Sequence, residues 1–123
     1  MILDAPDHVH ALREAAEALA PQVLSLTRQI SEIPAPTNDE SRRSRFFQHH
    51  AAQLGLQITT DDLGDVVARI PGRLSPGTGA KPLLIAAHLD TVFGKDVPLQ
   101  VSASEGRLAG PGIGDNSLAV ASV

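Results

Sequence analysis

The order of the sequence patterns predicts an α/β fold, with helices in the first half of the chain and mostly strands in the second. Apolar residues recur at steps of three and four up to residue 33, which is the spacing of one helix face. After Gly55 the apolar period changes to two, the spacing of a half-buried strand. Residues 83–87 are continuously apolar, which is typical of a strand buried on both faces. These patterns together predict helices layered on a sheet.

The first predicted helix carries a long apolar stripe. Its members are Leu12, Ala15, Leu19, Val23, Leu26, Ile30 and Ile33. Pro21 lies within the stripe and has no amide hydrogen to donate, so we expect a kink or a break near Ala20. Pro34 and Pro36 are expected to end the helix.

A capping signal precedes the second predicted helix, residues 38–54. Thr37 and Glu40 have the spacing of a capping box, in which the threonine hydroxyl accepts a bond from a helix amide and the glutamate reaches back. Gly55 is a suitable residue to close the helix.

Short strands are predicted after the second helix. Residues 56–60 and 66–70 alternate and read as a hairpin, and residues 99–103 alternate again before a turn at 104–106. Residues 116–123 have the composition of the opening of a further helix.

Composition excludes several classes of function. The 123 residues suit one domain, and a hydrophobic content of 42% is sufficient for a packed core. The absence of cysteine excludes disulfides, thiolate catalysis and zinc fingers. A net charge of −4 argues against nucleic acid and anionic membranes as partners, so Arg42, Arg43 and Arg45 are expected on a solvated helix face. Without an apolar run of about 20 residues, the protein is expected to be soluble and cytoplasmic.

The predicted buried strand ends in His88-Leu89-Asp90-Thr91. Residues i and i+2 of a strand share a face, so the ring of His88 and the carboxylate of Asp90 are expected to be neighbours. One ring nitrogen can then bind a metal while the other donates to the carboxylate. The alternative is a histidine bonded to an aspartate for structural reasons only.

A second acidic candidate, Asp115, follows three glycines in the stretch GPGIGDNS. A carboxylate on a stiff, glycine-rich turn suits a metal site built from two segments, and its two oxygens can bridge two cations. Asp115 can equally serve as the N-cap of the last helix, and the two roles are compatible. A phosphate loop is disfavoured, because the glycine spacing matches neither nucleotide-binding motif and an aspartate would repel the phosphate.

The stretches SEIPAPTNDE, AAHLDTVF and GPGIGDNS, in this order, resemble the M20 family of co-catalytic zinc peptidases and amidohydrolases. The sequences of these motifs are most similar to those of the peptidase-T and carboxypeptidase-like branches of the family. The resemblance implies an α/β/α catalytic domain with a central mixed sheet and flanking helices. Residues 1–123 would then be the N-terminal part of one such domain, ending before the remaining metal ligands and before the lid or dimerisation domain.

The resemblance also implies roles for the site residues. His88 would ligate one Zn²⁺, Asp90 would have the catalytic role of holding that histidine, and Asp115 would bridge two Zn²⁺ ions. Co²⁺ or Mn²⁺ would suit the same nitrogen and oxygen ligands. A cis peptide is implied between Asp115 and Asn116.

The implied reaction is hydrolysis of an amide bond in a small peptide or an N-acyl amino acid, by a protein that forms a homo-oligomer. The chain departs from the family at Ala119, where many members have glycine. The family's general-base glutamate and remaining ligands lie downstream of Val123, so residues 1–123 alone are expected to be inactive. The alternative is a non-catalytic binding or interaction module that keeps the fold.

Overall fold

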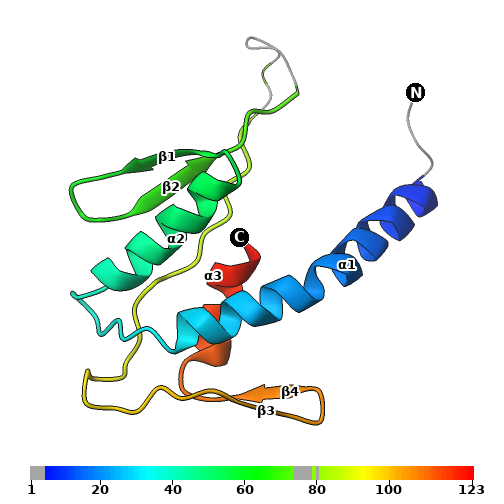
Figure 1. The fold of residues 1–123 in the computed structure, drawn as a ribbon. Helices are drawn as coiled ribbons and strands as arrows, with labels where there is room; N and C mark the ends of the chain where they lie inside the picture. Colours follow the sequence, from blue (N-terminus) through cyan, green and yellow to red (C-terminus); the bar gives the residue numbers. More distant parts are fainter. Residues whose placement is uncertain (1–4, 74–78, 80) are drawn as a thin grey trace.

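A computed structural model of the chain describes residues 5–73, 79 and 81–123. These residues include helices and short antiparallel strands, which confirms the α/β class at a coarse level (Figure 1). The described strands form two separate two-stranded sheets. The predicted central mixed sheet is therefore not formed within the described ranges.

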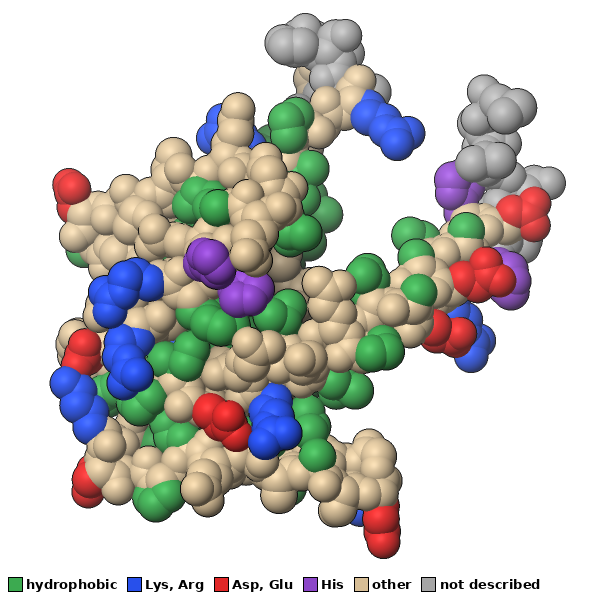
Figure 2. Space-filling model, viewed as in Figure 1, with side chains coloured by type: hydrophobic (Ala, Val, Ile, Leu, Met, Phe, Trp, Pro, Cys, Tyr) green, Lys and Arg blue, Asp and Glu red, His purple; other side chains and the backbone are tan. Residues whose placement is uncertain are grey.

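The first helix, α1 (Ala5–Ser31), continues through Pro21, so of the predicted kink or break near Ala20 the break does not occur. A proline inside a helix removes one backbone hydrogen bond, and the helix persists on both sides of it. The N-terminal part of α1 projects from the rest of the molecule and displays hydrophobic side chains (Figures 1 and 2). Leu12 is 69% exposed, whereas Ile30 near the other end is 4% exposed. The core therefore begins only in the last turns of α1.

The second helix, α2 (Ser41–Gln53), begins three residues later than predicted, and the capping box does not form. Its N-cap is Glu40, whose side chain makes no bond to the helix end. Glu40 Oε1 instead accepts a bond of 2.6 Å from the backbone N–H of Asn38, which has a φ of 71°. Asparagine tolerates this left-handed conformation better than most residues. The turn leaves Thr37 outside the helix, with its hydroxyl available to another partner.

Arg43 of α2 is buried, contrary to the prediction of a solvated face, whereas Arg42 and Arg45 are exposed. Its guanidinium donates to three backbone carbonyl groups. The acceptors are the oxygens of Ile33 at 2.9 Å, Leu89 at 3.1 Å and Ser31 at 3.5 Å. Burial lowers the pKa of Arg43. Arg43 thus joins the end of α1 and the start of α2 to the chain around residue 89.

The two sheets are both hairpins. Strands β1 (Gln57–Thr60) and β2 (Val66–Arg69) pair antiparallel beside α2, close to the predicted positions (Figure 1). Strands β3 (Ser102–Ser104) and β4 (Arg107–Ala109) form the second hairpin. The predicted strand at 99–103 is thus confirmed only in its last residues.

The prediction of a buried strand at 83–87 is wrong. This run forms no strand, and its large side chains are exposed. The exposed fractions are 86% for Leu83, 83% for Leu84 and 66% for Ile85. A strand needs a neighbour for its amides and carbonyls, and the described residues supply none at this run. Backbone pairing begins only at Thr91, which lies parallel to Pro36 and donates to the carbonyl of Ala35 at 2.7 Å.

The last elements are the turn η1 (Ile113–Ser117) and the short helix α3 (Leu118–Ser122), both packed against α1. The predicted helix at 116–123 is confirmed in its later part. The buried apolar residues of the described chain are Ile30, Ala35, Ala51, Leu99, Val101 and Val120. No helix within the described residues combines the length and the apolar composition needed to cross a membrane.

Candidate metal centre

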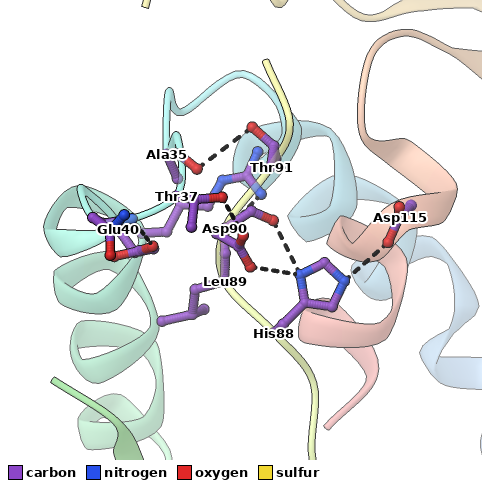
Figure 3. Close-up of polar contacts among 10 residues, drawn as sticks. Ala35, Thr37, Glu40, His88, Leu89, Asp90, Thr91 and Asp115 are labelled. Carbon is purple, nitrogen blue, oxygen red and sulfur yellow. Dashed lines mark hydrogen bonds and ion pairs between the residues drawn. The ribbon is translucent and has the colours of Figure 1, made fainter. Parts of the chain in front are cut away.

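His88 lies between two carboxylates that come from different parts of the chain (Figure 3). Its Nδ1 is 3.0 Å from Asp90 Oδ1, and its Nε2 is 2.9 Å from Asp115 Oδ1. The predicted proximity of His88 to Asp90, and of His88 to Asp115, is confirmed. The ring therefore connects the segment after residue 87 to the turn η1.

The site is open to water on the side of Asp115. The side chain of Asp115 is 84% exposed and that of His88 50%, whereas that of Asp90 is 34% exposed. Asp90 is the better sheltered of the two carboxylates, and Asp115 is the one that a ligand from solvent can reach.

Two of the positions before Asp115 require glycine, each for a different structural reason. Gly110 passes so close to the neighbouring chain that a Cβ there would lie 3.0 Å from both the carbonyl oxygen of Gln100 and Cγ2 of Val101. Gly112 has a φ of 72°, which side chains other than glycine rarely adopt. These constraints fix the path of the loop that carries Asp115.

The peptide between Asp115 and Asn116 is cis. The expectation drawn from the family resemblance is confirmed at this bond. Both residues depart from helical backbone angles, so η1 presents the Asp115 side chain outside the regular turn that follows it.

The two carboxylates favour a protonated His88 when no metal is bound. Partial burial opposes protonation, but the hydrogen bonds to Asp115 and Asp90 outweigh it and raise the pKa of His88 above its ordinary value of 6.5. The pKa of Asp90 is lowered, first by the hydroxyl of Thr37 and then, against some opposition from burial, by His88. A positively charged His88 ring thus lies between two negatively charged carboxylates.

Two contributors to the site were missed in the sequence. Thr37 Oγ1 donates to Asp90 Oδ2 at 2.7 Å, and Arg43 holds the backbone carbonyl of Leu89 beside the histidine. The sequence instead indicates a capping role for Thr37 and a solvated helix face for Arg43. No local pattern in the sequence pairs residue 37 or 43 with the segment 88–90, because the contacts arise from tertiary packing.

The described residues contain no group of three or more histidine, aspartate and glutamate side chains placed to hold a metal ion. They bring together one nitrogen and one oxygen atom of types that can ligate a metal, His88 Nε2 and Asp115 Oδ1. No protein-family model matches the chain, and no curated protein does so. Support for a metal centre therefore comes from this pair and from the motif resemblance.

A Gly110→Ala substitution is expected to destabilise the fold by about 1–3 kcal/mol, the usual range for overpacking a tight contact. The added methyl group would press on the backbone at Gln100 and Val101. Urea denaturation of the wild type and of the Gly110→Ala variant measures the change in the free energy of unfolding. Gly114→Ala is the matched control, because nothing lies within 4 Å of a Cβ at Gly114. Equal losses in the two variants would contradict the assigned role of Gly110.

The stability of the metal-free chain is expected to depend on pH through His88. Because its folded pKa is raised, the stabilisation is fully present below the unfolded value of 6.5 and is lost as pH rises through the folded pKa. Denaturation curves across this window, compared with those of His88→Gln, isolate the contribution of the ring. A difference between the two proteins that does not shrink with rising pH would contradict the ion-pair assignment.

Proposed function

We propose that the chain supplies part of a dinuclear zinc site in a peptidase or amidohydrolase of the M20 type, which hydrolyses an amide bond of a small peptide or an N-acyl amino acid. The observation that carries the proposal is the 2.9 Å separation between His88 Nε2 and Asp115 Oδ1. These atoms come from the two motifs on which the resemblance depends.

The donor atoms fit zinc. Histidine nitrogen and carboxylate oxygen are common zinc ligands with bonds near 2.0–2.2 Å, so two of them on a tetrahedral ion lie about 3.3 Å apart. The observed separation of 2.9 Å requires only a small widening to admit an ion in place of the shared proton. Co²⁺ and Mn²⁺ accept the same ligand types.

The residues of this chain would hold the metal in complementary ways. With a metal bound, Asp90 would accept a bond from Nδ1–H of His88, which would leave a lone pair on Nε2 for the metal. Asp115 has two carboxylate oxygens, enough to contact two ions at once. When bound, the metal ions would lower the pKa of a coordinated water and polarise the substrate carbonyl.

The described residues supply fewer ligands than a catalytic zinc needs, which is three protein ligands and a water. The family resemblance assigns the others, and the general-base glutamate, to sequence beyond Val123. The second candidate function is a non-catalytic binding module, and the two-ligand set within the described ranges is compatible with both candidates. The two candidates differ in whether the remaining ligands exist.

The expected homo-oligomer belongs to the same proposal. The exposed run Leu83-Leu84-Ile85 is the surface that self-association, or pairing with further sequence of the same domain, would cover. The molar mass in solution of the wild type, compared with that of a variant in which residues 83–85 are polar, tests the predicted self-association.

Hydrolysis assays separate the two candidates. Residues 1–123, and a polypeptide extended by the downstream sequence that the resemblance implies, are supplied with Zn²⁺ and tested on dipeptides, tripeptides and N-acyl amino acids. We expect turnover only by the extended polypeptide, lost on His88→Ala, because a general base alone contributes about 10²–10⁴-fold in rate. Zinc binding without turnover by the extended polypeptide would favour the binding module.

A further inference from the structure

The hydroxyl of Thr37 is the second partner of the Asp90 carboxylate (Figure 3). Thr37 Oγ1 donates to Oδ2 at 2.7 Å, while Oδ1 faces Nδ1 of His88 at 3.0 Å. Each oxygen of the carboxylate thus has its own donor. Two bonds in different directions fix the rotation of the carboxylate, which has a broad torsional range when one bond holds it.

Backbone contacts on either side of Asp90 hold its segment in place beside Thr37. Residues 35–37 run beside residues 89–91, where Thr91 donates to the carbonyl of Ala35 at 2.7 Å. The buried Arg43 holds the carbonyl of Leu89 from α2. The contact between the two side chains is therefore set by anchored segments, although Thr37 itself is exposed.

The orientation of Asp90 bears on the ring proton of His88. A neutral imidazole has one N–H, and here carboxylates face both nitrogens. A metal needs Nε2 without a proton, so the proton must lie on Nδ1, toward Asp90. A carboxylate held in place competes for that proton better than one that rotates, and Asp115 is 84% exposed.

We propose that Thr37 is a positioning residue, whose hydroxyl holds Oδ2 of Asp90 so that Oδ1 stays on Nδ1 of His88 and the ring keeps Nε2 directed toward Asp115. The consequence for metal affinity rests on the proposed function, whereas the location of the ring proton does not. The role is separate from the capping role that the sequence indicated for this threonine.

The test compares Thr37→Val, which keeps the shape and removes the hydroxyl, with Thr37→Ser, which keeps the hydroxyl. Thr59→Val is the matched control, because Thr59 is an exposed threonine of strand β1. The ¹⁵N shifts of the His88 ring are measured in the metal-free proteins at a pH where the imidazole is neutral. Zinc affinity is measured by competition with a chelating dye.

We expect Thr37→Val to move the ring proton of His88 from Nδ1 toward Nε2 and to weaken zinc binding by up to about 10-fold. The effect is smaller than that of losing Asp90 itself, the direct outer partner of the ligand, for which the usual cost is about 10–100-fold. Thr37→Ser and Thr59→Val are expected to resemble the wild type in both measurements. If the wild type binds no zinc while Thr37→Val still moves the proton, the metal proposal fails and the positioning role stands. An unchanged tautomer in Thr37→Val, or an equal change in Thr37→Ser, would overturn the role of Thr37.

Discussion

Replacing Asp115 by alanine is expected to weaken zinc binding by about 100-fold or more. Loss of an outer partner of a ligand already costs about 10–100-fold, and in the proposed site Asp115 would be one of the two direct ligands from the described residues. Its side chain is 84% exposed and makes its contact through His88, so the fold is expected to remain stable. Competition titration with a zinc-binding dye gives the affinity, and circular dichroism checks the fold.

Asp62→Ala is the control for the loss of one negative charge, because Asp62 is an exposed aspartate in the turn between β1 and β2. Its zinc affinity is expected to equal that of the wild type. If both variants lose affinity to the same extent, binding depends on net charge, and the site assignment is wrong.

Replacing Arg43 by methionine is expected to lower the free energy of unfolding by about 2–4 kcal/mol. Methionine keeps an apolar stem but removes the donors to three backbone carbonyls, and a buried polar group without a partner costs about 1–3 kcal/mol. Urea denaturation measures the loss. Lysine at this position is expected to give an intermediate value, because an ammonium lacks the planar fork of donors.

Arg45→Met is the matched control on the same helix, since Arg45 is exposed. Its effect is expected to stay within about 0.5 kcal/mol, as for most surface substitutions. If Arg43→Met is as stable as this control, the buried hydrogen bonds of Arg43 contribute no net stability. The role of Arg43 in holding the carbonyl of Leu89 would then be wrong.

Local patterns predicted those elements that local interactions determine. The hairpin of β1 and β2 follows from a change of period and a turn rich in aspartate and glycine, and both are visible within a few residues. The apolar stripe of α1 correctly predicts burial only near Ile30. The rest of the stripe is exposed or half-buried, because burial requires a partner surface that the spacing does not specify. The continuous apolar run 83–87 predicts a buried strand, but strand pairing is a tertiary property that an apolar run does not specify.

The candidate site was predicted more completely than the fold around it. The position of His88 at the end of an apolar run, the glycine-rich turn before Asp115 and the motif resemblance predict the two residues as a pair, and the contact confirms their proximity. Thr37 and Arg43 were assigned to local roles, a cap and a solvated face. Their partners are 53 and 46 residues away in sequence, and no spacing rule covers such contacts.

The central claim is that His88 and Asp115 together hold a metal ion, and anomalous diffraction at the zinc edge tests it directly. Crystals of the chain grown with Zn²⁺ are expected to show a peak within about 2.0–2.2 Å of both His88 Nε2 and a carboxylate oxygen of Asp115. The same crystals should retain the contact between His88 Nδ1 and Asp90. A zinc peak at other residues, with His88 still bonded directly to Asp115, would contradict the claim.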